Sequence, residues 1–98
     1  MIGIRLIIEK NKKEKIISQV STINLFKDLK NVHIENYKIK NTLVWEFEIE
    51  QDVLTNQILS IFSNQWNIIF NESNCINSAT CGNRIKFDGI SWINIELY

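Results

Sequence analysis

The sequence predicts an α+β fold in which two helices cover one face of a mostly antiparallel β-sheet. Three observations support this prediction. Residues 43–50 place Leu, Trp, Phe and Ile on one side of an extended chain and three Glu on the other, as in a half-buried strand. Residues 14–29 and 53–65 carry apolar side chains at helical spacing. The chain has no Pro and only three Gly, so few residues interrupt regular structure.

The beginning of the chain predicts a strand followed by a helix. In residues 2–9 one face is aliphatic and Ile7 makes the other face partly apolar, which is typical of an inner strand. Residues 10–15 are basic and form either a solvated connection or a phosphate-binding patch. The helix is expected over residues 14–29, and Asn31 is a suitable C-terminal cap.

Residues 32–40 and 43–50 predict two strands joined by a tight turn at residues 41–42. Apolar residues change faces within the first of these strands, which implies a bulge near Asn36. His33 alternates with apolar neighbours, so we expect it on the outer surface of the sheet. No nearby residue would make it a catalytic base.

The second helix is expected over residues 53–65, with Asp52 as its N-cap. Residues 67–71 are short, apolar and β-branched, and predict another strand. Residues 71–83 are rich in Asn, Ser and Thr and predict the longest loop.

The C-terminus predicts a hairpin, because Asp88-Gly89 separates the alternating residues 84–87 and 90–97 and favours a type I′ turn. The element order is then β-α-β-β-α-β with an extra C-terminal hairpin, and its first part is a ferredoxin-like arrangement. The hairpin would either extend an edge of the sheet or replace its last strand.

The length of 98 residues is that of a single domain, residues 1–98. No apolar run approaches the roughly 18–20 residues that span a bilayer, so we expect no membrane partner. Arg5 interrupts the apolar N-terminus, so we expect a strand and a cytoplasmic protein without a signal peptide. The spacing of Cys75 and Cys81 allows a disulfide, but a cytoplasmic chain favours free thiols. Together with the distant His33 they do not complete a zinc site, and we expect no metal or other cofactor.

The net charge of zero hides a strong asymmetry. Residues 1–40 hold nine basic and four acidic side chains, a balance of +5, whereas residues 41–98 hold two and seven, a balance of −5. Such a division favours a charged partner or a polarised surface. It argues against simple nucleic-acid binding, which requires a basic excess over the whole domain.

The sequence offers little for catalysis, and we expect a protein that is not an enzyme. There is no nucleophile with a base and no glycine-rich phosphate loop. Glu46 and Glu48 lie roughly 7 Å apart on one strand face. That spacing could serve acid–base chemistry, but a sheet of this size has little wall for a cleft. We therefore interpret these carboxylates as a solvated face or a partner-binding surface.

If the helices leave one face of the sheet bare, that face combines carboxylates with aromatic side chains. Aromatic residues supply contact energy to an interface, and carboxylates select a basic partner. The residues that we expect to bind a partner are Glu46, Glu48, Glu50, Asp52, Trp92, Glu96 and Tyr98.

In size, composition and layout, this small, Asn-, Ile- and Lys-rich chain resembles the immunity proteins of bacterial contact-dependent growth inhibition and related toxin systems. The resemblance spans the whole chain, rests on no motif and carries over no individual residue. It implies that the protein binds the C-terminal toxin domain of a cognate effector, commonly a nuclease, and neutralises it by occluding its active site. The zero net charge departs from the acidic character of many nuclease inhibitors and leaves the class of toxin open.

The alternative is a small nucleic-acid-binding or regulatory module with a ferredoxin-like fold. It would bind through a basic surface and would be sensitive to salt. The sequence also leaves open whether the protein dimerises through an exposed edge strand. The residues of the basic surface would be Lys10, Lys12, Lys13, Lys15, Lys38 and Lys40.

Overall fold

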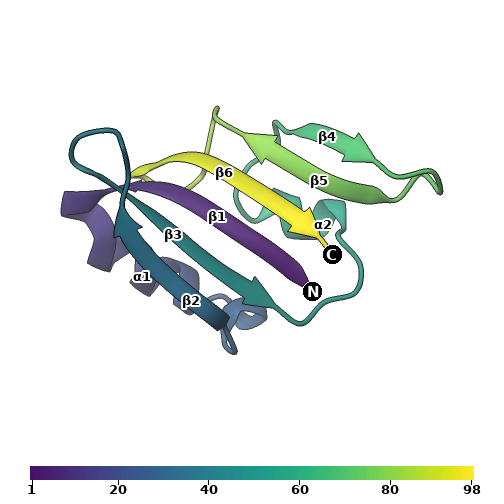
Figure 1. Cartoon of the computed structure of the whole chain (residues 1–98), viewed down its shortest axis with the longest axis horizontal. Coiled ribbons are helices and arrows are strands. Elements are labelled where there is room, and N and C mark those ends of the chain that lie inside the picture. Colours follow the sequence, from purple (N-terminus) through teal and green to yellow (C-terminus); the bar gives the residue numbers. More distant parts are fainter.

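The computed structural model describes residues 1–98 as one six-stranded antiparallel sheet with two short α-helices. Both helices lie on the same side of the sheet (Figure 1), which confirms the predicted α+β architecture. Two 3-10 turns, Lys10–Lys12 and Asn24–Phe26, complete the regular structure. The elements are β1 (Ile2–Glu9), α1 (Lys13–Ser21), β2 (Lys30–Asn36), β3 (Thr42–Ile49), α2 (Asn56–Ser60), β4 (Asn67–Phe70), β5 (Ile76–Cys81) and β6 (Ile90–Leu97).

Strand β1 holds the centre of the sheet and pairs antiparallel with β3 on one side and β6 on the other. Leu6, for example, lies opposite Trp45 of β3 and Ile93 of β6. The even-numbered aliphatic residues of β1 are at most 2% exposed because they point toward the helices. Ile7, on the opposite face, is also buried, which agrees with the prediction of an inner strand.

The core fills the space between the sheet and the helical layer with twenty buried apolar residues. Phe26, on the turn after α1, packs against Phe47 of β3 and against Phe62 just after α2, each with ring centroids 5.7 Å apart. These rings join the two halves of the chain across the middle of the core. Apolar burial of this kind is the main source of stability in a domain of this size.

The strand order is β2-β3-β1-β6-β5-β4. This order differs from a ferredoxin-like sheet, so that part of the fold prediction is not confirmed. Strands β4 and β5 extend the sheet beyond β6 (Figure 1). The edges of the sheet are therefore β2 and β4.

The predicted C-terminal hairpin is wrong in its first strand. Residues 84–87 are not a strand, and β6 pairs instead with β5, which forms inside the predicted 71–83 loop. Tertiary contacts explain the difference. The buried Ser63 hydroxyl donates to the Arg84 carbonyl at 3.0 Å, and the Lys86 amide donates to the Phe62 carbonyl at 2.7 Å. Residues 84–87 are thus bound to the end of the helical layer and cannot pair with β6.

The predicted type I′ turn at Asp88-Gly89 is also wrong, because that turn requires positive φ at both central residues. Only Gly89 has positive φ, at 98°. Asp88 instead accepts hydrogen bonds from Lys12 at 2.9 Å and Lys15 at 3.5 Å, which attach this connection to the start of α1.

Both helices are shorter than their apolar spacing predicts. Helix α1 ends at Ser21, and Ile23 is already extended, with φ −73° and ψ 128°. Helix α2 begins after Thr55, whose hydroxyl accepts a hydrogen bond from the Ile58 amide at 3.3 Å, so Asp52 is not the N-cap. In both segments tertiary packing of the flanking apolar residues overrides a weak helical preference.

Two predictions about β2 are corrected as well. Asn31 has the positive φ of a cap, 51°, but it lies inside β2 at a register shift between Lys30 and His33. No bulge forms near Asn36, where β2 ends. The apolar residues change faces there because the chain leaves the sheet and turns back into β3.

Replacement of Phe62 by Ala should cost about 3–5 kcal/mol of unfolding free energy, since the fully buried ring leaves a cavity beside Phe26 and Phe87. Urea unfolding followed by tryptophan fluorescence measures this loss. The control is Phe70→Ala, because Phe70 is 56% exposed and its loss should change the free energy by no more than about 0.5 kcal/mol. Equal losses in the two variants would contradict this description of the core.

Candidate functional site

The face of the sheet that points away from the helices is the candidate site, and it is called the open face below. The register of the strands arranges its side chains in rows that cross the sheet. One row runs from Glu35 on the edge strand β2 to Val44, Ile7 and Trp92, and apart from Glu35 it is apolar. The next two rows, followed from β2 to β5, are mainly polar. His33, Glu46, Arg5, Asn94 and Thr80 form the first, and Lys30, Glu48, Gly3, Glu96 and Ser78 form the second.

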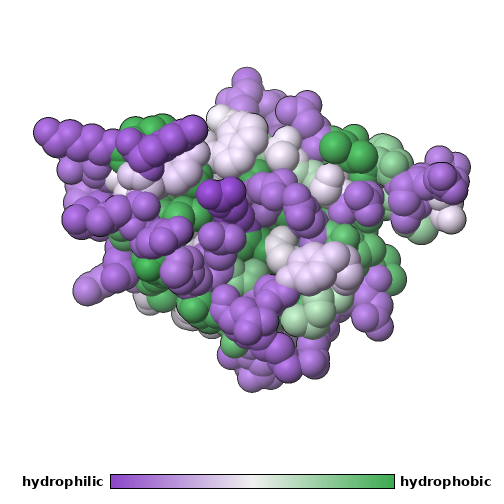
Figure 2. All heavy atoms as spheres, in the orientation of Figure 1, coloured by the Kyte–Doolittle hydropathy of each residue, from purple (hydrophilic) through white to green (hydrophobic).

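The polar rows surround a shallow depression of about 480 Å³ over β2, β3, β1 and β6. Figure 2 shows hydrophilic residues over much of this side of the molecule, with pale and green hydrophobic patches between them. Three carboxylates and one guanidinium line the depression, which leaves two net negative charges when His33 is neutral. The charged residues of the lining are Glu46, Glu48, Glu96 and Arg5.

The charged groups of the open face differ in how far the chain itself satisfies them. Glu48 accepts a hydrogen bond from the side-chain amide of Asn31, and Glu96 accepts one from Asn94 at 3.1 Å. Glu46 has no hydrogen bond or ion pair within the chain. The remaining acceptor positions of these carboxylates are open to an external donor.

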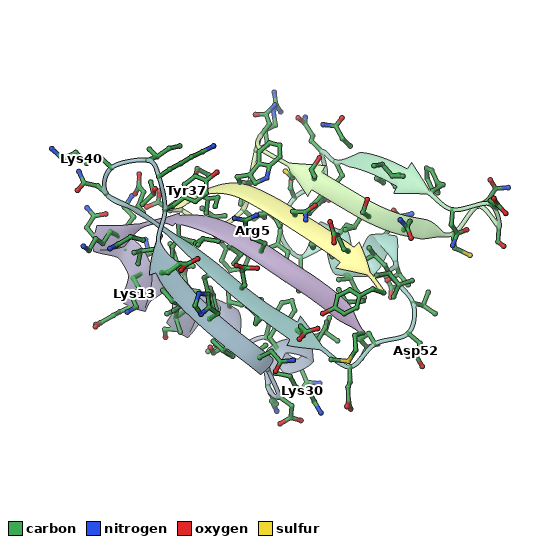
Figure 3. The ribbon with its side chains drawn as sticks, in the orientation of Figure 1. Arg5, Lys13, Lys30, Tyr37, Lys40 and Asp52 are labelled. Atoms are coloured by element: carbon green, nitrogen blue, oxygen red, sulfur yellow. The ribbon has the colours of Figure 1, made fainter.

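Arg5 lies in the middle of the open face (Figure 3), opposite Glu46 on β3 and Asn94 on β6. It is exposed, and its guanidinium makes no hydrogen bond or ion pair within the chain. From the sequence we expected only carboxylates as charged groups on this face, but the open face also carries a cation. It places one free cation between carboxylates.

Two aromatic rings lie on the open face directly over glycines. A Cβ atom on Gly3 would be 2.9 Å from Cε1 of Tyr98, and a Cβ atom on Gly82 would be 2.7 Å from Cε3 of Trp92. Only glycine lets the rings approach the backbone so closely. Tyr98 remains 66% exposed and Trp92 43% exposed, so both rings are supported from below and accessible from outside.

The structure brings together most of the predicted site residues but not all of them. Glu46, Glu48, Glu96 and Tyr98 line the depression, and Trp92 borders it in the apolar row. Two predicted residues lie outside it, Glu50 and Asp52, and Figure 3 shows Asp52 well away from Arg5.

Glu50 forms an ion pair within the chain, since Lys30 Nζ lies 2.7 Å from its carboxylate. The hydrogen bond from Lys30 lowers the pKa of Glu50, and the same contact raises the pKa of Lys30. Asp52 is exposed in the connection between β3 and α2. Neither residue lines the depression.

Sequence reasoning missed Arg5, Gly3 and Asn94 as members of this site. The alternation in β1 already placed Gly3 and Arg5 on its second face. The sequence could not show the register between β1 and β3, and that register sets Arg5 beside Glu46. His33 was expected on the outer surface, where its Nε2 lies 3.3 Å from Glu35.

Cys75 and Cys81 are free thiols, the first exposed and the second buried. The structure contains no group of three or more His, Cys, Asp or Glu side chains that could hold a metal ion. None of its helices has the length and apolar character needed to cross a membrane.

No protein-family model matches the chain, and no curated protein or solved structure was found to be similar to it.

The Glu50 carboxylate should titrate below its ordinary pKa of 4.5, because the Lys30 ammonium favours its ionised form. The stabilising effect of this pair is therefore present above pH 4.5 and is lost as the pH falls through the lowered pKa. Carbon-detected NMR of the Glu50 side chain measures the midpoint. Lys30→Met should raise that midpoint toward 4.5, and an unchanged midpoint would show that the ion pair does not form in solution.

Gly3→Ala should lift the Tyr98 ring off the sheet while the fold is retained, since the clash is with the end of an exposed side chain. In the native protein the ring current of Tyr98 should shift the Gly3 Hα resonances upfield, and Tyr98→Ala should abolish that shift. Nuclear Overhauser contacts between residue 3 and the Tyr98 ring should weaken in Gly3→Ala. Contacts of unchanged strength would show that the Tyr98 ring does not need a glycine at position 3 to pack against the sheet.

Proposed function

We propose that this protein is an immunity protein that binds a cognate toxin domain through the open face and neutralises it by occlusion. The observation that carries the proposal is the open face itself. It presents carboxylates, one unpaired guanidinium and two exposed aromatic rings on a side of the sheet that no helix covers. The resemblance in size, composition and layout to immunity proteins supports the same conclusion.

The aromatic rings would supply the central contacts of the interface. Trp92 and Tyr98 lie on the sheet backbone, so little side-chain freedom is lost when a partner covers them. Large aromatic side chains contribute much of the binding energy in protein interfaces. Glu46 and Glu48, which are half-buried in the two polar rows, would receive basic side chains of the partner.

Arg5 adds a requirement that the sequence did not suggest. A partner that covers the open face must give its guanidinium an acceptor, because an unpaired buried charge is costly. The complementary surface is therefore mostly basic, with at least one carboxylate or carbonyl group opposite Arg5. Nucleases bind phosphate through basic clefts, so such a cleft fits the negative charge of the depression. Covering it would block substrate entry.

The proposed interface does not include all seven residues that we expected from the sequence. Glu50 is bound by Lys30, and Asp52 lies beyond the depression. The interface that we propose centres on Glu46, Glu48, Arg5, Trp92 and Tyr98.

The first test is genomic: the proposal predicts a gene for a large secreted effector directly upstream. The second uses the C-terminal domain of that effector, purified as a catalytically inactive variant. Calorimetry should detect tight binding to the native protein. Double reversal, Glu46→Lys with Glu48→Lys, should weaken that binding roughly 100-fold and abolish protection in a growth assay. The matched control is Glu14→Lys with Glu72→Lys, which changes the net charge equally away from the open face and should bind normally.

Equal weakening in both double variants would mean that net charge, and not the open face, governs recognition. If the native protein neither binds that domain nor protects against it, the proposed function is wrong.

A further inference from the structure

The end of the molecule formed by the start of α1 and the β2–β3 turn gathers basic side chains from separate segments. A hydrogen bond from the Lys10 amide to the Asn41 carbonyl, 2.9 Å long, joins the two segments. Figure 3 shows Lys13 and Lys40 at this end and Asp52 far from them. We call this region the basic end; its cations are Lys10, Lys12, Lys13, Lys15, Lys38 and Lys40.

The chain neutralises only part of this charge. Lys12 Nζ lies 3.1 Å from Glu9 and 2.9 Å from Asp88, and Lys15 Nζ lies 3.5 Å from Asp88. The other four cations form no ion pair within the chain: Lys10, Lys13, Lys38 and Lys40. Their grouping is unfavourable within the fold and favours an external anion.

An open depression of about 710 Å³ lies between Lys10 and Lys40. Its lining contains no apolar residue: Asn11, Asn41 and Thr42 border it, together with Glu9, whose carboxylate lies 3.1 Å from Lys12 Nζ. A phosphate group placed there could accept hydrogen bonds from the lysines and the asparagine amides.

Beside the depression, the β2–β3 turn presents Ile39 to solvent. Ile39 is 56% exposed and stands between two of the unpaired lysines. The turn is held firmly, since the Thr42 hydroxyl donates to the Ile39 carbonyl at 2.6 Å and the Tyr37 amide donates to the Thr42 carbonyl at 3.1 Å. Lys38 Nζ lies 5.7 Å from the centre of the half-buried Tyr37 ring, so the lysine covers one face of this ring.

We propose that the basic end docks on the surface of an anionic lipid bilayer. Ile39 enters the boundary between headgroups and acyl chains, and the unpaired lysines contact lipid phosphates around it. An exposed aliphatic tip adds nothing to binding of a nucleic-acid backbone, and no free aromatic ring is present at this end to stack on a base. From the sequence we expected no membrane partner because no segment could span a bilayer, but surface attachment needs no spanning segment.

This inference goes beyond the proposed function and does not depend on it. Glu46 on the open face and Thr42 at the basic end are four residues apart along β3. This is about 13 Å by strand rise, which exceeds the Debye length of about 8 Å at physiological ionic strength. The carboxylates of the open face therefore do not cancel the attraction between the basic end and an anionic surface. Attachment by this end leaves the depression around Arg5 free for a protein partner.

The test is co-sedimentation of the full chain with vesicles of phosphatidylcholine alone and of phosphatidylcholine with phosphatidylglycerol, in 0.15 M salt. Only the anionic vesicles should bind the protein. Lys38→Gln with Lys40→Gln should weaken binding roughly 25-fold, since each lysine near an anionic surface contributes roughly fivefold. Ile39→Ser should weaken it roughly tenfold without changing its salt dependence.

Two variants serve as matched controls. Lys27→Gln removes an exposed lysine elsewhere, and Val53→Ser removes an apolar residue that is 58% exposed, on the connection before α2. Both should bind anionic vesicles like the native protein.

Failure to bind anionic vesicles, or unchanged binding by Ile39→Ser, would overturn the proposal. A parallel titration uses fluorescent 20-base-pair DNA and RNA duplexes. Duplex binding that falls in the lysine variant and persists in Ile39→Ser, with no vesicle binding, would assign the basic end to nucleic acid. None of these outcomes bears on whether the open face binds a toxin domain.

Discussion

The pairing of β1 with both β3 and β6 is the constraint on which the rest of the structure depends. Side chains alternate between the faces of a strand, so one register decides which residues enter the core and which reach the open face. With Leu6 opposite Trp45 and Ile93, the large apolar residues of three strands meet beneath the helices. The same register sets Arg5 beside Glu46. A slip of one residue would exchange the two faces and destroy the core and the candidate site together.

The open face combines rigidity with accessibility because its aromatic rings rest on glycines. Gly3 and Gly82 carry no Cβ, and the rings of Tyr98 and Trp92 occupy the space that a side chain would fill. A ring supported in this way covers backbone that would otherwise be exposed on a strand, and still offers its outer surface to a partner. The third glycine serves the fold: Gly89 has φ 98°, and a Cβ there would approach Ile16 of α1. This close approach holds the connection into β6 against the helical layer.

The charge asymmetry of the sequence becomes a separation in space. Six of the eight lysines in the first forty residues gather where α1 begins and the β2–β3 turn lies, whereas Glu48 and Glu96 face each other across Gly3 on the sheet. The separation is incomplete on both sides. Arg5 lies among the glutamates of the sheet, and Asp88 lies among lysines and joins Lys12 and Lys15 to the connection before β6. The lysine contacts lower the pKa of Asp88, so this attachment persists until the pH falls below the ordinary carboxyl range. The molecule thus offers one surface suited to a basic partner and another suited to an anionic one.

Periodicity alone determined the α+β class, the faces of β1, β3 and β6, and the exposed position of His33, because alternation along a strand is a local property. The sequence could not show that residues 76–81 pair with β6 while residues 84–87 do not. Which segment pairs with β6 depends on the hydrogen bonds that join Ser63 and Phe62 to residues 84–87. It also could not place Arg5 among the glutamates or remove Glu50 from the site, since both depend on the register and folding of other strands. Local spacing decides which way a side chain points, and only the packed sheet decides what it meets there.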